Sequence, residues 1–179
     1  MGKRTFTISL NVKDIEKLKK QLIQYRDVEL PNKCRLLVQR LAEIGLNTAQ
    51  VHIDEAPLGK YVRLRVEESP ITAGYKAILI ATGDVKKSEG REDFNTLLAI
   101  EFGAGVYYNK DKNPQADVLG YGPGTFPGQI HAFEDGWYYW DEKVGEWRYT
   151  HGVKATMPMY KADVEIIKRA VEIAREVFA

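Results

Sequence analysis

The sequence predicts a single α+β domain, and three observations lead to that prediction. Apolar residues recur at helical spacing near both ends of the chain, and they alternate with polar residues between positions 60 and 67. Aromatic residues gather in a glycine-rich stretch at 103–150. We therefore expect two N-terminal helices and a C-terminal helix packed on a small antiparallel sheet. Residues 1–179 are expected to form one domain, with 103–150 as a loop and hairpin insertion.

Two helices are expected before residue 55. Asn11 is a suitable N-cap for the first, and Pro31 is a suitable opening residue for the second. The apolar stripe of the first helix is Ile15, Leu18, Leu22 and Tyr25. The stripe of the second is Cys34, Leu37, Leu41, Ile44, Thr48 and Val51. Because Cys34 lies on this stripe, we interpret it as a small buried apolar group rather than a nucleophile.

The middle of the chain reads as strands. Val62, Leu64 and Val66 alternate with polar residues, which predicts a half-buried strand, and "SPITAG" at 69–74 is expected to turn the chain. The run "YKAILIATG" at 75–83 predicts a second, more central strand, and 84–94 a polar loop. The segment "NTLLAIEFG" at 95–103 fits either a strand or a short helix.

The insertion at 103–150 is expected to end in an aromatic β-hairpin. Twelve of the nineteen aromatic residues lie between Phe102 and Tyr149. "WYYWD" at 137–141 and "EWRYT" at 146–150 flank a four-residue turn. Among these aromatics we select Trp137, Tyr139 and Trp147 as the candidate contacts to a partner.

A C-terminal helix is expected from about Tyr160. It carries two adjacent apolar stripes, one of Val164, Ile167, Val171, Ala174 and Phe178 and one of Ile166, Ala170, Ile173 and Val177. A face that broad indicates burial against more than one neighbour.

The stretch "GYGPGTFPG", Gly120 to Gly128, resembles a phosphate-binding loop only in its glycines. A P-loop needs a Lys and a Ser or Thr after its last glycine, and no Lys or Arg occurs between Asn113 and Trp137. The dinucleotide fingerprint fails because Pro127 interrupts it and its last glycine is one position late. We interpret the stretch as a corner that sets the angle of the hairpin. Valine at Gly122 and Gly124 is expected to misdirect the hairpin and leave the domain folded.

Catalytic and metal-binding patterns are missing from the sequence. The three histidines are scattered, and neither H-x-x-x-H nor C-x-x-C occurs. We expect no enzyme activity and assign no catalytic, metal-binding or cofactor-binding residue. A small enzyme that uses the acidic residues flanking the hairpin is kept as the last alternative. These residues are Glu134, Asp135, Asp141 and Glu142.

Charge is distributed unevenly along the chain. Residues 1–40 hold ten Lys or Arg against four Asp or Glu, whereas 84–150 hold seven against twelve. Two solvated faces would explain this pattern, and so would head-to-tail attraction between copies or a basic end near nucleic acid. The aromatic hairpin is acidic, which fits a protein interface better than a nucleic-acid platform. Packing of its rings on their own domain is the other interpretation. No apolar run approaches the ~20 residues of a membrane span, so we expect no membrane partner.

Two short motifs carry a resemblance to a known family. "AIEFGAG" at 99–105 and "GVKATMPMYKA" at 152–162 occur in the order and at the spacing found in a tail-component family of long-tailed bacteriophages. That family is named for gene product ten of the HK-ninety-seven type phage. Ala104 stands where the family has Thr, and the proline of the second motif, Pro158, is shifted by one place. The matching residues are Glu101, Phe102, Gly103, Gly152, Ala155, Met159 and Ala162.

The resemblance implies a structural virion protein without enzyme activity, assembled in the bacterial host cytoplasm. It implies a hexameric or dodecameric ring at the neck or the head-proximal end of the tail, joining tail to head. Neighbours would be head-closure, connector or tail-tube proteins, and DNA would pass through the lumen without sequence-specific contacts. A tail terminator or another tail-completion ring is the alternative within this class. A nucleic-acid-binding module that uses the basic N-terminal helix is the alternative from another class.

Overall fold

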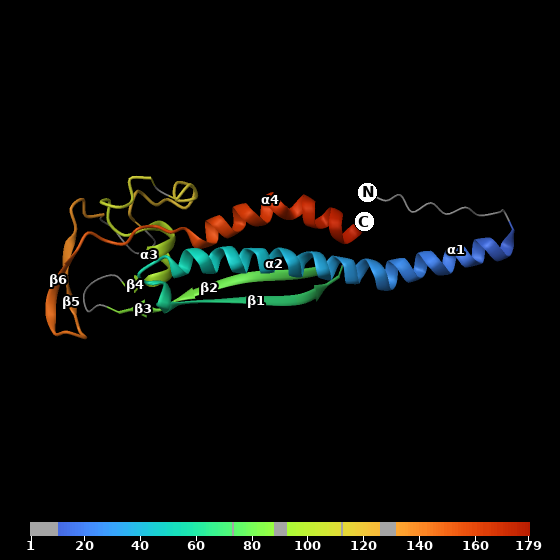
Figure 1. Cartoon of the computed structure of the whole chain (residues 1–179), viewed down its shortest axis with the longest axis horizontal. Helices are drawn as coiled ribbons and strands as arrows, with labels where there is room; N and C mark the ends of the chain where they lie inside the picture. The colour runs from blue at the N-terminus through green and yellow to red at the C-terminus, as the bar shows by residue number, and fades with distance from the viewer. Residues whose placement is uncertain (1–10, 73, 88–92, 112, 126–131) are drawn as a thin grey trace.

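The computed structural model describes residues 11–72, 74–87, 93–111, 113–125 and 132–179 (Figure 1). The α-helices are α1 (Val12–Gln24), α2 (Leu30–Asp54), α3 (Thr96–Phe102) and α4 (Pro158–Phe178), and shorter turns are π-helical at Tyr25–Glu29 and 3₁₀ at Gly59–Tyr61. The strands are β1 (Val62–Ile71), β2 (Gly74–Gly83), β3 (Val85–Lys86), β4 (Phe94–Asn95), β5 (Trp137–Asp141) and β6 (Glu146–Thr150). This mixture of helices and antiparallel strand pairs confirms the α+β class.

The two expected N-terminal helices form one continuous rod. Asn11 caps it as expected, because its Oδ1 accepts the backbone N–H of Asp14 at 2.8 Å. The π-helical turn joins α1 directly to α2, and within it the Leu30 N–H donates to the Tyr25 carbonyl. Proline has no N–H and its ring crowds the carbonyl four residues earlier. A π turn just before Pro31 therefore lets the chain pass the proline without a break.

The body has three layers, with α2 in the middle, α4 on one side and the β1–β2 hairpin on the other (Figure 1). Gly45 lies where the three layers meet. A Cβ added there would come within 2.6 Å of Ile166 Cδ1 on α4 and 3.3 Å of Leu79 Cδ2 on β2. Glycine at this position therefore permits the close approach of both neighbours to α2.

The buried faces of both long helices differ from the predicted stripes. On α2 the buried residues are Ala42, Gly45, Ala49 and Ile53. Small side chains occupy the centre because two layers press on it, and Val51 of the predicted stripe is 56% exposed. On α4 only the second stripe faces inward, where Ile173 and Val177 are buried. The helix α4 packs against both α2 and α3, as expected of a broad apolar face, but the first stripe leaves Val164, Ile167 and Val171 exposed.

The strands form three separate two-stranded antiparallel sheets instead of one small sheet. The β1–β2 register runs from Val62 opposite Gly83 to Ile71 opposite Gly74, so the first strand continues through half of the segment expected to turn. The open choice at 95–103 is resolved as helix α3, because Asn95 Oδ1 accepts the N–H groups of Leu97 and Leu98 at 3.0 and 3.2 Å.

The tightest packing lies at one end of the body, where α3 meets the end of α2. Ile53 and Ile100 are almost fully buried there, and Ala99 and Phe102 lead to a second cluster with residues of the insertion. This packed end carries the β5–β6 hairpin, while α1 extends from the opposite end (Figure 1).

Candidate functional site

A buried carboxylate connects the two segments that carry the family resemblance. Glu101, at the end of α3, is 7% exposed. Its Oε2 accepts the Met159 N–H at 2.8 Å, and its Oε1 accepts the Tyr160 N–H at 3.0 Å and the Asn113 side-chain amide at 2.9 Å. Glu101 thus caps the N-terminus of α4 from a distant part of the chain.

Burial raises the pKa of Glu101, because an ionised carboxylate loses solvation there. The backbone N–H groups of Met159 and Tyr160 and the amide of Asn113 act in the other direction. Both oxygens of this buried carboxylate already accept hydrogen bonds from within the protein. Glu101 therefore acts as a cap for α4.

Asn109 makes a second set of bonds beside Glu101. Its Nδ2 donates to the carbonyls of Gly105 at 2.7 Å and Val153 at 2.9 Å, while its Oδ1 accepts the Ala155 N–H at 2.8 Å. Gly103 lies against it at a φ of 83°, where an added Cβ would come within 2.3 Å of the Asn109 side chain.

The two motifs therefore meet in a single junction. Gly152 is held at a φ of 105°, and a Cβ added there would come within 2.0 Å of the Ala104 carbonyl. Phe102 is 7% exposed and Ala162, one turn beyond Met159, is 1% exposed. The buried partners Asn109 and Asn113 were missed from the sequence, where an asparagine in a loop has no distinguishing pattern.

The β5–β6 hairpin forms as predicted, with Trp137 opposite Thr150 and Asp141 opposite Glu146. Alternation along the strands sorts its side chains onto two faces. One face carries only aromatic residues, and we call these four the aromatic quartet. They are Tyr138, Trp140, Trp147 and Tyr149.

The aromatic quartet is a paired and exposed surface. Tyr138 and Tyr149 are opposite in register with ring centroids 5.1 Å apart, and Trp140 and Trp147 are opposite with centroids 5.7 Å apart. The four residues are 64%, 46%, 50% and 63% exposed in that order. Trp and Tyr provide large contact areas with little side-chain entropy to lose, so this face is suited to binding another macromolecule.

The three candidate contacts selected from the sequence do not form one surface. Trp147 belongs to the aromatic quartet, whereas Trp137 and Tyr139 point to the other face. Trp137 packs against the core cluster around Phe102, and its ring lies 5.6 Å from that of Phe133. Tyr139 is 41% exposed. Period-two alternation, applied to both strands, would have separated the two faces.

The glycine and proline corner is only partly within the described residues, because 126–128 lie outside them. Gly124 is held at a φ of 65°, and its carbonyl accepts the Gly105 N–H at 2.9 Å. A Cβ added to Gly124 would come within 2.3 Å of the Gly105 carbonyl oxygen, while Gly122 has room for one. The expectation that both glycines tolerate valine was therefore wrong at Gly124, because this corner docks on the junction.

One of the four acidic residues that flank the hairpin, Asp141, is engaged by its carboxylate in local structure. In the turn, Asp141 Oδ1 accepts the Lys143 N–H at 3.0 Å. Arg148 Nε lies 3.2 Å from Glu146 Oε1 and 3.6 Å from Asp141 Oδ2. The Asp135 carbonyl accepts the Tyr149 hydroxyl. No group of three or more metal-binding side chains occurs among the described residues.

Lysines surround Tyr61 at the same end of the body. The ammonium groups of Lys60 and Lys86 lie 5.1 and 5.5 Å from the centre of its ring. The positive charge of Lys143, in the hairpin turn, is the largest cause that lowers the pKa of the Tyr61 hydroxyl, followed by that of Lys60. The Lys143 side chain therefore reaches from the hairpin turn to Tyr61.

Comparison of the chain with protein-family models, with curated proteins and with solved structures found no match. Within the part of the chain that the structure describes, no helix is long and apolar enough to cross a membrane.

Proposed function

We propose that this protein is a structural subunit of a larger assembly and that the aromatic quartet is a surface through which it docks. The single observation that carries the proposal is the exposure of four large aromatic side chains on one face of a two-stranded hairpin. A soluble domain rarely leaves so much aromatic surface in water unless another molecule covers it.

The sequence resemblance extends the proposal to a particular assembly. The subunit would form a ring at the neck or the head-proximal end of a bacteriophage tail, where it joins tail to head. The structure lends support because the residues of the two resembling motifs meet in the junction around Glu101 and Asn109. Two short segments that matched the family by chance would have no reason to meet in the structure. Their contact in one junction therefore favours a fold shared with that family. A tail-terminator ring has the same support.

The experiment uses particles from a phage or prophage that encodes this chain. Deleting the coding segment should leave full heads and tails unjoined in electron micrographs, and a plasmid-borne wild-type copy should restore joined particles. A copy with Trp140→Thr and Trp147→Thr should fail to restore them, whereas Tyr139→Thr, on the other face of the same strand, should succeed. Normal particles without the protein would contradict the proposed function.

Nucleic-acid binding is the second candidate, favoured by the lysines around Tyr61. Ammonium groups at an exposed position suit contacts with phosphate, which are independent of base sequence and weaken steeply with salt. A mobility-shift assay with duplex DNA at several salt concentrations tests this candidate. Binding that withstands high salt or selects one sequence would contradict phosphate contact.

A further inference from the structure

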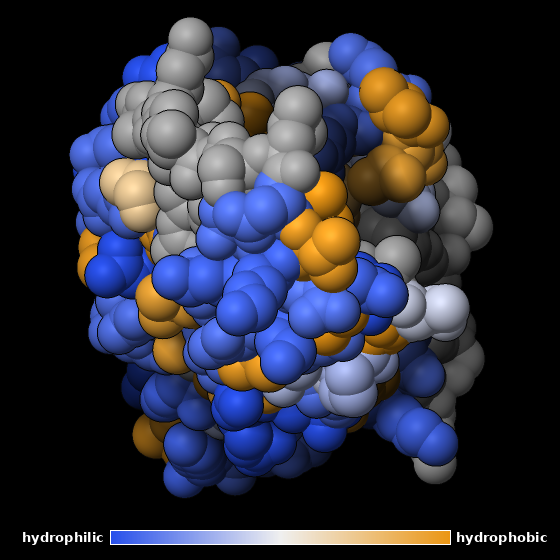
Figure 2. All heavy atoms as spheres, turned by 90° about the vertical axis from the view of Figure 1, so that its right-hand side faces the viewer, coloured by the Kyte–Doolittle hydropathy of each residue, from blue (hydrophilic) through white to orange (hydrophobic). Residues whose placement is uncertain are grey.

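The helix α1 has an apolar face that no described part of the chain covers. None of its residues is buried, and Ile15 and Leu22 are 48% and 49% exposed. Apolar side chains emerge among polar ones in the end-on view of the molecule (Figure 2). Six residues line a shallow depression along this face: Ile15, Leu18, Lys19, Leu22, Ile23 and Arg26.

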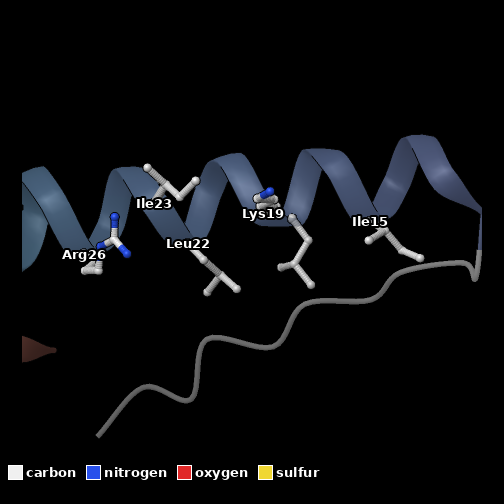
Figure 3. A pocket seen from close by; sticks show the side chains of 6 residues that line it. Ile15, Lys19, Leu22, Ile23 and Arg26 are labelled. Carbon is white, nitrogen blue, oxygen red and sulfur yellow. The ribbon is translucent and has the colours of Figure 1, made fainter.

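Two cationic side chains lie within this apolar face. Ile15 and Leu22 point to the same side of the helix, and Lys19 and Arg26 lie beside them (Figure 3). Arg26 is paired with the neighbouring Asp27, with its Nε 2.6 Å from Oδ1. An aliphatic face that includes ammonium and guanidinium groups suits aromatic rings, because cations are attracted to ring faces.

Among the described residues, this end of the rod has little tertiary packing. None of the 13 residues of α1 is buried, so the segment depends on its own helical hydrogen bonds, which stabilise a helix only weakly in water. Its amphipathic pattern gives it an apolar side that would gain from burial. A partner that covers this side would both shield apolar surface and stabilise the helix.

The aromatic quartet has the complementary chemistry. Residues 132–150, which contain it, hold five carboxylates against Lys143 and Arg148. The helix α1 holds four lysines against Asp14 and Glu16. Pairing two α1 helices through this face would bring Lys19 and Arg26 of both copies together, whereas the aromatic quartet carries no charge of its own and belongs to a hairpin that is acidic overall. Charge therefore favours contact between a helix and a hairpin.

We propose that the apolar face of α1 docks on the aromatic quartet of a second copy of this chain. The helix and the hairpin lie at opposite ends of the long axis (Figure 1), so one copy cannot make this contact with itself. A head-to-tail contact of this kind leaves one free surface at each end of a pair, and repetition gives a ring or a filament. The inference rests on the proposed function, because it names the contact through which that assembly would grow.

Variants of the purified full chain test the inference by sedimentation velocity. The helix variant is Ile15→Gln with Leu22→Gln, and its matched control is Gln21→Ala with Gln24→Ala on the polar side of α1. The hairpin variant is Trp140→Thr with Trp147→Thr, and its control is Tyr139→Thr. All substituted residues are exposed, so far-UV circular dichroism should show folded protein in each case.

Wild-type chain and both controls should self-associate, with association weakened by added salt. Each variant alone should associate at least about tenfold more weakly, because central aromatic and apolar anchors dominate binding. An equimolar mixture of the two variants should form a 1:1 dimer and nothing larger. In that mixture one intact hairpin still meets one intact helix.

Other outcomes would overturn the inference. A wild-type chain that stays monomeric at high concentration would do so. If the helix variant retained wild-type association, the contact would be hairpin to hairpin. If the hairpin variant retained it, the contact would be helix to helix. A mixture without dimers would also overturn it.

These results concern purified protein, so joined or unjoined particles still decide the proposed function separately. If a hairpin variant proves unfolded, the single substitution Trp147→Thr at a 63% exposed side chain tests the same face with less disturbance, and unchanged association would refute the contact.

Discussion

Replacement of Glu101 by alanine tests whether the buried carboxylate holds the junction together. The substitution removes the acceptor of the Met159 and Tyr160 N–H groups at the start of α4 and of the Asn113 amide. Of these donors, the Asn113 side chain is fully buried and the Met159 and Tyr160 N–H groups are part-buried, around a carboxylate whose residue is 7% exposed. Without the carboxylate they lose these bonds and gain little solvation in return.

The magnitude follows from these contacts. A lost helix cap costs roughly 0.5–2 kcal/mol, and each donor left without a partner in a buried site costs roughly 1–3 kcal/mol. Because burial of an ionised carboxylate is itself unfavourable, its removal offsets part of this loss in the free energy of unfolding. We expect a net loss of about 2 kcal/mol in the free energy of unfolding, or roughly 4–8 °C in Tm for a chain of this size.

Urea denaturation followed by circular dichroism measures this loss. The matched control is Glu172→Ala, which removes an exposed glutamate from α4 whose Oε2 lies 2.9 Å from Arg169 Nε. We expect the control to change stability by less than about 0.5 kcal/mol. Equal urea midpoints for the two variants would show that Glu101 does not hold α4 to the junction, and our explanation of the two motifs would then be refuted.

Three further predictions concern the junction and the hairpin. Because the folded pKa of Glu101 lies above its ordinary value of 4.5, the proton contributes stability below pH 4.5 that is lost as pH rises through the folded pKa. Wild-type protein should therefore lose stability relative to Glu101→Gln over that interval in urea titrations, and a constant or opposite difference would contradict the assigned shift. Gly124→Ala should destabilise by about 2 kcal/mol or more, since a positive φ costs an L-residue roughly 1–2 kcal/mol and the new Cβ meets the Gly105 carbonyl, whereas Gly122→Ala should have little effect. Equal thermal midpoints for these two variants would count against the docked corner. Lys143→Ala should raise the pKa of Tyr61, observed by NMR of labelled tyrosine, and an unchanged pKa would mean that the Lys143 side chain does not reach Tyr61.

Local patterns in the sequence were sufficient for several elements. Asn11 and the apolar spacing after it predicted the start of α1, and the two aromatic runs with a four-residue turn predicted β5 and β6. Each of these signals lies within a few residues of the element that it predicts. The α+β class followed from the same local periodicities.

Features that depend on distant contacts could not be predicted from the sequence. Pro31 suggested a new helix, because a π turn that accommodates proline has no signature in the residues before it. The buried centre of α2 at Gly45 is set by Ile166 and Leu79, which pack on it from two other elements. In the candidate site, the role of Glu101 depends on backbone N–H groups almost sixty residues later in the chain.

The most direct test of the central claim is a cryo-electron microscopy map of the assembled protein within the particle. We expect several copies arranged head to tail in a ring, with Trp140 and Trp147 of each copy covered by α1 of the next. A single copy per particle, or a ring in which the aromatic quartet faces solvent, would contradict it.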